Sequence, residues 1–386
     1  GVLAAQGQDT FTWSGYVTPT PDSTTTASWN VPTTTVSIGS ASGGLTGEMT
    51  LSGGAAATFG GLMLERGSLS LVNASLTVTG SAYSVIGTST NSDATLTLDN
   101  SRMLVTSMHV GSNNGAVGAV IVSNASVLTS SSYFMVGNSS SGSLLITGSG
   151  SAVHAGEMRV GAYTDSTGAV TISNGAAFYC GWNASYQNFV VGSGGTGTFL
   201  VTGAGSTASI ARLAIGGYPT LSGGTGVMTI AAGASLTISE YTEIGYTNGN
   251  GTLALEGGSA NFGSTVSVGI RASGAGTLRA SNATDEISIG QTLSIGANGT
   301  LAFNVDLNEP NDGSAIITAD AISFDAAGGY IVDFTALAEN IDTAILLLQV
   351  SGAVSDEMKQ IAWEINGLDA AFGTATTEWI GNSLYL

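Results

Sequence analysis

The sequence predicts an all-β protein, a parallel β-solenoid (β-helix) of about eleven three-strand coils with a β-rich C-terminal region. Three observations lead to this prediction. A Val-Gly-like step recurs along the chain, most often every 24 residues, each period alternates apolar and polar residues, and the turns are rich in glycine and asparagine. A fixed period of this length is typical of repeat architectures, and alternation with a period of two is typical of strands.

The Val-Gly step marks one corner of each predicted coil. In the strand before each glycine, the first and third positions are nearly always apolar, as in Met108 and Val110, whereas the middle position varies, as in His109 and Arg159. This pattern predicts a strand that buries one face only. The ten copies of the step end at Gly39, Gly87, Gly111, Gly137, Gly161, Gly192, Gly216, Gly245, Gly269 and Gly296.

A second strand follows each polar corner, and a third follows a small-residue turn, as in "NASVLT" at 124–129. Three short strands joined by tight turns make one triangular coil, because glycine and asparagine accept positive φ at low cost. Successive coils are expected to stack in parallel, roughly 4.8 Å apart. The inward pairs of the second strand are Met49/Leu51, Leu69/Leu71, Leu96/Leu98, Val120/Val122, Leu144/Ile146, Val170/Ile172, Phe199/Val201, Met228/Ile230, Leu253/Leu255, Leu278/Ala280 and Leu301/Phe303.

One corner contains a complete G-x-G-x-x-G pattern, formed by Gly192, Gly194 and Gly197. In a dinucleotide-binding site this pattern opens a helix, whose free N–H groups bind the pyrophosphate. Here the next residues, 198–203, have the composition of a strand. The pattern is therefore interpreted as a coil corner, and the sequence gives no reason to expect a bound cofactor.

Composition limits the classes of function. The 386 residues carry 26 acidic and 7 basic side chains, for a formal net charge of −19, and Lys359 is the only lysine. Such a surface repels phosphate backbones and anionic lipid, which argues against binding to nucleic acid or to a membrane surface. The best apolar run, residues 344–350, is far shorter than the roughly 20 residues of a membrane span, so no membrane insertion is expected.

The repeat units also resemble a known family. The segments "VGSGGTGTFLVTGAGSTASIARLAIG" at 191–216 and "GTGVMTIAAGASLTISEYTEIG" at 224–245 are similar to the repeat of autotransporter (type V secretion) passengers and of exosortase-sorted bacterial surface proteins. The opening "FTWSG" and "ASWNV" resemble the entry segment of such passengers, and "GTLAFNVD" resembles their exit. The resemblance implies a β-helix that is secreted by a bacterium and is extracellular or displayed on the cell surface. It implies no shared catalytic residues.

Three regions are predicted from the change in pattern. Residues 1–35 contain three of the five prolines and two tryptophans, which suits an N-terminal cap or docking segment. Residues 36–305 contain the solenoid repeats. In residues 306–386 the period fades and acidic residues accumulate, which indicates a C-terminal β-rich capping or assembly region. A single helical turn is expected near 355–360.

Charged residues on the outward face of the strand before the corner are the candidates for catalysis. They are Glu157, Arg159, Arg212 and Glu243. Glu157 and Arg159 lie on one face of the same predicted coil, but Ala214 stands in the coil between Arg159 and Glu243, and no second carboxylate joins the pair. Because acid–base catalysis needs close partners, we interpret them as surface charge and expect the protein not to be an enzyme. The alternative is a β-helix polysaccharide lyase or glycosidase.

Metal and thiol chemistry has little support in the sequence. His109 and His154 lie in different strands and have no repeating Cys or Asp partner, so no zinc site is expected. Cys180, the only cysteine, occupies an inward position and is interpreted as a buried apolar residue. An oxygen-rich segment at 306–313 supplies weak candidates for binding calcium, which are Asp306, Asn308 and Asp312.

The function that the sequence favours is a structural subunit of an extracellular, self-assembling filament or surface layer. The extended, apolar ends of the chain are expected to join copies head to tail by β-strand addition. The assembly candidates are Val2, Leu3, Phe11, Trp13, Ile380, Leu384 and Leu386. The alternative is a surface adhesin that binds glycans through aromatic residues in the two longest intervals, which are Tyr179, Trp182, Tyr186 and Tyr218.

Overall fold

The computed structural model describes residues 10–15, 17–18, 28–40, 44–81, 83–88, 90–113, 115–181, 188–217, 223–271, 273–282, 284–306, 313–336, 344–366 and 375–386. The protein is a parallel β-solenoid of about eleven turns, which confirms the predicted fold class. The chain divides into two compact units. The N-terminal unit comprises residues 1–189 and 193–199, and the C-terminal unit comprises residues 190–192 and 200–386.

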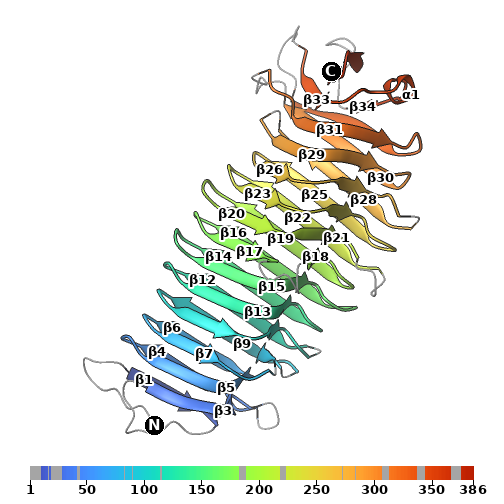
Figure 1. The fold of residues 1–386 in the computed structure, drawn as a ribbon. Helices are drawn as coiled ribbons and strands as arrows, with labels where there is room; N and C mark the ends of the chain where they lie inside the picture. Colours follow the sequence, from blue (N-terminus) through green and yellow to red (C-terminus); the bar gives the residue numbers. More distant parts are fainter. Residues whose placement is uncertain are drawn as a thin grey trace. The chain divides into compact units, whose positions relative to one another are not determined.

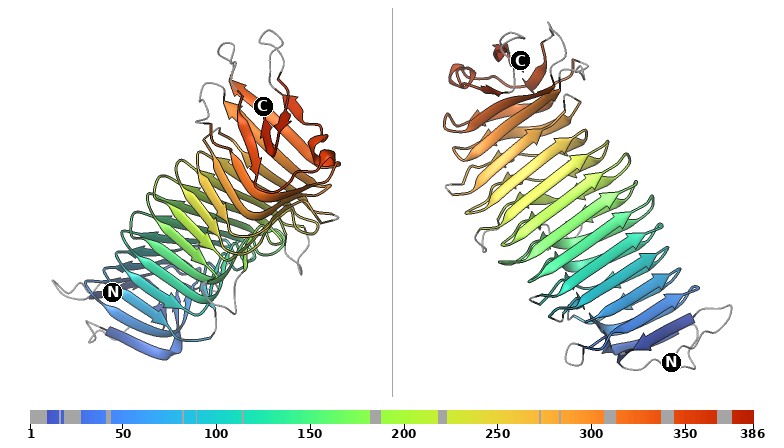
Figure 2. Two further views of the ribbon diagram at one scale, coloured as in Figure 1. Left: turned by 45° about the horizontal axis from the view of Figure 1, so that its top comes forward. Right: turned by 180° about the vertical axis from the view of Figure 1, so that it is seen from behind.

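In the N-terminal unit, one sheet is formed by the strand that follows each corner (Figure 1). Its strands are β4 (Gly47–Ser52), β6 (Gly67–Val72), β9 (Asp93–Asp99), β12 (Val117–Ser123), β14 (Ser141–Thr147) and β16 (Thr167–Ser173). They pair in parallel and in register, so that Val120 lies beside Leu144, and Leu144 lies beside Val170. Strand β1 (Thr10–Gly15) pairs antiparallel with β4 (Figure 2).

The other sheet of this unit is formed by the remaining strands of each coil. They are β3 (Ser28–Ile38), β5 (Ala56–Leu64), β7 (Ser75–Val78), β8 (Ser84–Ile86), β10 (Arg102–Val105), β11 (Met108–Val110), β13 (Val127–Val136), β15 (Ala152–Val160) and β17 (Ala177–Cys180). Strand β2 (Val17–Thr18) pairs antiparallel with β3. Two strands, β18 (Asn188–Val191) and β19 (Thr196–Thr202), contain residues of both units.

The C-terminal unit repeats the plan. Its first sheet contains β22 (Thr225–Ala231), β25 (Asn250–Glu256), β28 (Ala275–Ala280), β30 (Gly299–Asp306), β32 (Gly329–Ala336) and β34 (Glu364–Asn366). Its second sheet contains β20 (Thr207–Ile210), β21 (Arg212–Ile215), β23 (Ser235–Ile238), β24 (Thr242–Ile244), β26 (Ser259–Phe262), β27 (Val266–Val268), β29 (Glu286–Ile295), β31 (Ile317–Phe324) and β33 (Leu346–Val350). Two short strands, β35 (Glu378–Ile380) and β36 (Ser383–Tyr385), form an antiparallel pair, and β36 also pairs with β33.

The coils differ from the predicted triangle in one respect. In β3, β5, β13, β15 and β29, the third strand of one repeat runs directly into the strand before the next corner, so the two form one bent strand. The pairing register shifts at the bend, for example between Ser130 and Tyr133. The bend lies in the polar segment 130–133, and pairing with β15 resumes at Tyr133, which lies beside Glu157.

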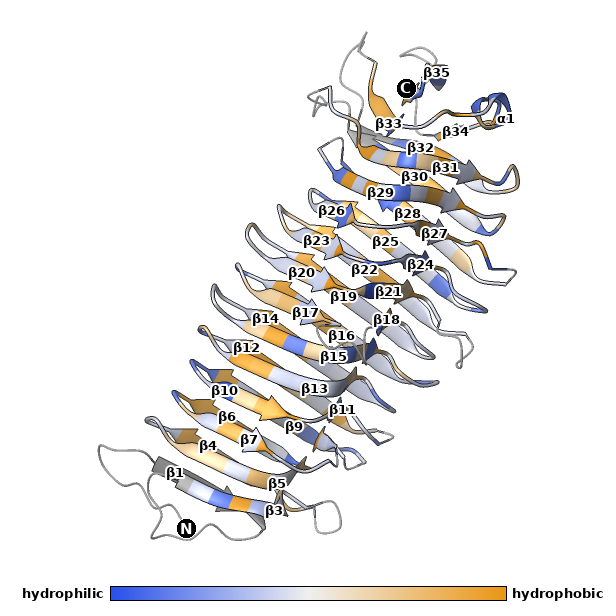
Figure 3. Ribbon diagram, in the orientation of Figure 1, coloured by the Kyte–Doolittle hydropathy of each residue, from blue (hydrophilic) through white to orange (hydrophobic). Residues whose placement is uncertain are grey.

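The core consists of the inward residues that the alternation predicts. All eleven predicted pairs of the second strand are buried, with at most 2% of any side chain exposed. Figure 3 shows the alternation of hydrophobic and hydrophilic residues along the strands. In the N-terminal unit, Phe178, Phe189 and Phe199 form a cluster with ring centroids 4.7 to 5.4 Å apart. Such buried aromatic side chains contribute a large part of the hydrophobic stabilisation of a coil.

The corner glycines are required by both conformation and space. Nine of the ten have a positive φ, for example +69° at Gly137, and Gly296 is the exception. A Cβ at Gly137 would also overlap backbone atoms of Thr167 and Gly168 in a neighbouring coil. Only glycine satisfies both requirements at low cost.

Tryptophan side chains cover the core near the ends of the stacked coils. Trp29 in β3 is 6% exposed and packs edge-on against Phe59 of β5, with ring centroids 5.0 Å apart. In the C-terminal unit, Trp363 packs against Phe303 and Tyr330, with centroids 5.8 and 5.4 Å away. Both tryptophans therefore pack on aromatic side chains, and the assignment of residues 1–35 and 306–386 as caps stays a prediction.

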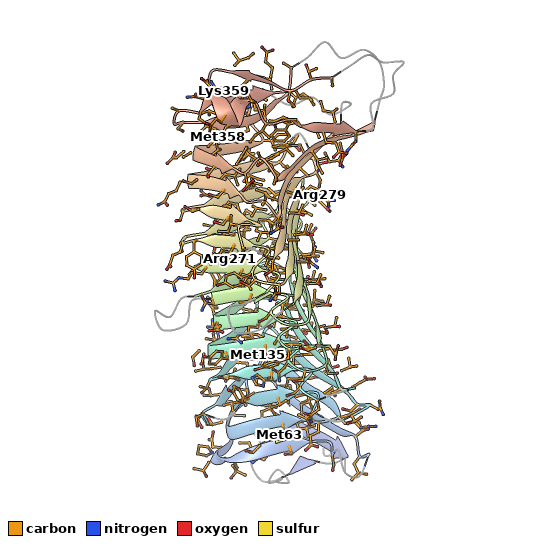
Figure 4. All side chains as sticks on the ribbon, turned by 90° about the vertical axis from the view of Figure 1, so that its right-hand side faces the viewer. Met63, Met135, Arg271, Arg279, Met358 and Lys359 are labelled. Atoms are coloured by element: carbon orange, nitrogen blue, oxygen red, sulfur yellow. The ribbon has the colours of Figure 1, made fainter. Side chains whose placement is uncertain are left out.

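The parallel stacking extends past residue 306. Strand β31 pairs in parallel with β29, and β32 pairs in parallel with β30. The expected helical turn is confirmed as α1 (Asp356–Lys359), which begins at the N-cap Ser355 and carries Met358 and Lys359, both labelled in Figure 4. Among the described residues, the structure contains no helix that is long and apolar enough to span a membrane.

Candidate functional site

The outward face of β15 carries the only candidate pair whose members touch. Arg159 donates from Nε and Nη2 to the same oxygen, Oε1 of Glu157, at 2.9 and 2.8 Å. Both side chains are largely buried, with exposed fractions of 14% and 6%. In β13, Tyr133 lies beside Glu157 and Met135, labelled in Figure 4, lies beside Arg159. The Glu157 carboxylate is therefore held by a cation, which favours a structural ion pair.

The other two charged candidates have partners of their own. Arg212 donates from Nε to Glu240 at 2.5 Å and lies over the ring of Tyr241. Glu243 accepts from Arg271, labelled in Figure 4, at 2.5 Å. The residues grouped by sequence thus separate into independent ion pairs. Each of these contacts joins a carboxylate to an arginine, and none of them joins two carboxylates, the arrangement that a glycosidase uses. The absence of enzymatic activity stays a prediction.

The two histidines lie in different strands, as expected, and each stacks on a tyrosine. His109 of β11 lies 3.9 Å from the ring of Tyr83, and His154 of β15 lies 4.7 Å from that of Tyr179. His109 is 9% exposed, its Nε2 has no hydrogen-bond partner among the described residues, and burial lowers its pKa to about 4. It is therefore neutral at pH 7. Within the described ranges no three His, Cys, Asp or Glu side chains gather at a possible metal site.

Cys180 is buried, as its inward position predicts. Its Sγ lies 3.8 Å from the carbonyl oxygen of Gly156, and its side chain is unpaired with any other cysteine. Burial, together with the nearby negative charge of Glu157, raises the pKa of this thiol far above its usual value. A thiol with so little thiolate is a poor nucleophile, which agrees with its interpretation as an apolar core residue.

A buried carboxylate, Asp285, fastens one corner of the C-terminal unit. Its Oδ1 accepts from the N–H groups of Gly257 and Gly258 at 2.7 and 3.1 Å, and its Oδ2 accepts from those of Ser281 and Asn282 at 2.7 and 2.8 Å. Burial raises its pKa, and the four N–H groups act in the opposite direction. Since both oxygens are fully used by the backbone, Asp285 is a structural group.

The G-x-G-x-x-G corner has no N–H groups to offer a phosphate. The amides of Ser193, Gly194 and Gly195 all donate to the carbonyl oxygen of Gly161, at 3.0, 3.3 and 3.1 Å. Residues 196–202 then form strand β19 and not a helix. The interpretation of this motif as a coil corner is confirmed.

Several predicted site residues fall outside the described part of the chain. Asp306 ends strand β30, whereas Asn308 and Asp312 are not described, so the calcium hypothesis stays a prediction. Tyr179 is 37% exposed and stacks on His154. The remaining aromatic candidates for glycan binding, Trp182, Tyr186 and Tyr218, lie outside the described residues, as do the assembly candidates Val2 and Leu3.

Four of the five described assembly candidates lie on short antiparallel strands. Phe11 and Trp13 belong to β1, opposite Leu51 and Met49 of β4. At the other end of the sequence, Ile380 belongs to β35 and is 60% exposed. Leu384 of β36 is fully buried in its own unit, and β36 is already paired with β33 on one edge and with β35 on the other. The backbone of Leu386 is already paired with that of Ile345.

A polar groove that the sequence analysis did not single out lies in the C-terminal unit. It has a volume of about 660 Å³ and lies over the outer face of β23, β26, β29 and β31. The segment Gly313–Ala315 and Leu346 of β33 also line it. Apart from Glu286, the outward residues of its floor are ordinary Ser, Thr and Asn residues of the repeat, so no local pattern distinguishes the groove from other coils.

No protein-family model, curated protein or solved structure matches this chain.

Proposed function

We propose that the protein is a structural subunit of an extracellular filament or surface layer, in which copies are joined end to end by β-strand addition. The observation that carries this proposal is the edge strand β35. Its partner β36 occupies one edge, no strand of the described chain pairs with the other, and Ile380 is 60% exposed there. Two of its three residues, Trp379 and Ile380, are apolar, and an edge strand with unpaired backbone groups is a template for pairing with another chain.

The N-terminal unit offers a complementary edge. Strand β1 pairs with β4 on one side, and none of the described strands lies against its other side. In an antiparallel strand, alternate residues direct their N–H and C=O groups toward each edge, so β1 presents about half of its backbone groups to a partner. We assign the contact to β1 of one copy and β35 of the next.

Such a contact joins two different surfaces. Repetition of a heterologous contact that does not close on itself produces a fibre. Pairing supplies backbone hydrogen bonds, and burying the exposed part of Ile380 contributes roughly 1–2 kcal/mol. The low lysine and arginine content, 7 residues in 386, leaves few sites for trypsin-like proteases, which suits a durable extracellular polymer.

Cysteine cross-linking tests the proposed contact directly. The variant Thr12→Cys/Ile380→Cys places one thiol on each edge, and the native Cys180 is buried, so it adds little background. Oxidation is expected to give a ladder of disulfide-linked multimers in a denaturing gel without reductant. Each single variant has no second thiol across the contact between β1 and β35, so it should give no ladder. Only monomers from the double variant, at concentrations where filaments are visible by electron microscopy, would refute this contact.

A charged substitution tests whether Ile380 contributes to assembly. Ile380→Lys is expected to abolish filament growth without unfolding the protein, because the side chain is mostly exposed in the single chain. Ile270→Lys is the matched control, since Ile270 is another exposed isoleucine of the same unit, at 45%. Light scattering and negative-stain microscopy at matched concentrations report the outcome. If Ile380→Lys and Ile270→Lys reduced assembly equally, the cause would be the change in net charge, and β35 would not be the assembly contact.

A further inference from the structure

We infer that the polar groove of the C-terminal unit binds a neutral polysaccharide chain. This function goes beyond assembly and involves neither β1 nor β35. The groove is built on parallel strands, where the register aligns Thr237 of β23, Asn261 of β26 and Ser288 of β29. These three side chains are exposed, whereas their sequence neighbours Leu236, Ala260 and Ile287 are buried in the core.

The floor carries two rows of hydrogen-bonding side chains. Thr237, Asn261 and Ser288 form one row, and Ser235, Ser259 and Glu286 form the other. Neighbouring strands are roughly 4.8 Å apart, and residues two apart along a strand are roughly 7 Å apart. Each hydroxyl and amide both donates and accepts hydrogen bonds. A ligand that presents hydroxyl groups along its length can bond to successive strands in both rows.

The charge of the groove selects the ligand. Among the described residues that line it there is no Lys, Arg or His, and Glu286 is the only one of them with an ionisable side chain. A chain of uronate, sulfate or phosphate groups would meet no cation there and would be repelled by the net charge of −19. A neutral polyhydroxyl chain meets no such repulsion, and Glu286 can accept hydrogen bonds from its hydroxyl groups.

The groove is poorly suited to a peptide. Strands β26, β29 and β31 are each paired on both edges, so they offer no free backbone for strand addition. Peptide recognition also uses apolar pockets for anchoring side chains, and Leu346 is the only large apolar side chain among the described residues of the wall. The volume of about 660 Å³ lies within the range of roughly 300–1,000 Å³ that is usual for small-molecule sites, which admits a short segment of a polysaccharide.

Titration calorimetry on the full chain tests this inference, because it reports binding whether or not the protein is assembled. The probes are four neutral polysaccharides (dextran, laminarin, galactomannan and arabinoxylan) and one anionic polysaccharide, alginate. Binding of at least one neutral probe and no binding of alginate are expected. The variant Asn261→Ala/Ser288→Ala removes two floor hydrogen-bonding groups and should weaken binding about tenfold. Ser288→Trp should abolish it by filling the groove.

The control variant is Thr77→Ala/Thr129→Ala. Both threonines occupy the equivalent outward position in β7 and β13 of the N-terminal unit, away from the groove. This variant should bind as the wild type does. Three results would each overturn the inference: no binding of any neutral probe, binding that survives Ser288→Trp, or tighter binding of alginate than of the neutral probes.

Discussion

Gly137 has a positive φ and also no space for a Cβ. Replacing it by alanine should therefore destabilise the N-terminal unit more than replacing a glycine that has only one of these two features. Gly137 has φ +69°, and an added Cβ would overlap the carbonyl group of Thr167 and the amide of Gly168. Left-handed backbone costs an alanine roughly 1–2 kcal/mol. Overpacking against a fixed backbone costs roughly 1–3 kcal/mol more. The smaller entropy of the unfolded alanine chain offsets about 0.4–1 kcal/mol, which leaves a loss of about 2–4 kcal/mol.

Two glycines of the same unit separate these contributions. Gly44 has φ +60° and would place its Cβ in open space, so Gly44→Ala should cost only about 1 kcal/mol. Gly142 lacks a positive φ, but its Cβ would overlap Gly137 and the carbonyl oxygen of Val110, so Gly142→Ala should cost about 1–3 kcal/mol. Urea unfolding, followed by far-UV circular dichroism and tryptophan fluorescence, measures all three variants. If Gly44→Ala lowered the free energy of unfolding as much as Gly137→Ala does, the overlap of the Cβ with a neighbouring coil would not contribute to the loss.

Three further outcomes are expected. Because burial lowers the folded-state pKa of His109 to about 4, its neutral form contributes stability that is present above pH 6.5 and is lost as the pH falls toward 4. This loss is at most about 3 kcal/mol. When the free energy of unfolding is measured against pH, it should fall less in the variant His109→Gln than in the wild type. Asp285→Asn should cost about 2–4 kcal/mol, since the amide NH2 cannot accept from two of the four N–H groups; an unchanged urea midpoint would contradict this. Phe178→Ala should cost about 3–5 kcal/mol and Phe178→Leu clearly less; equal melting temperatures for the two variants would argue against aromatic packing with Phe189 and Phe199.

The sequence by itself determined the repeat, the buried face of each strand and the corners at which the backbone has a positive φ. These features depend on local rules. Alternation with a period of two assigns Val120 and Val122 to the core wherever the strand lies, and a corner that needs positive φ selects glycine. The same rules placed Cys180 inside and the helical turn at α1. They also predicted a strand after the G-x-G-x-x-G pattern, and therefore a coil corner and not a phosphate site.

The tertiary structure alone decided which residues meet between coils. Glycines such as Gly118, Gly142 and Gly168 lack a positive φ, so nothing local explains them; a Cβ there would collide with the corner of an adjacent coil. Similarly, Arg212 pairs with Glu240 and not with another member of its predicted column, because stacking brings residues 28 positions apart into contact. The polar groove has the same origin. Its side chains resemble those of other coils, and it exists only because the segment 313–315 and β33 form a wall beside strands that are otherwise open to solvent. Register between coils is set by the summed length of strands and turns, a property of the whole stack that no single repeat contains.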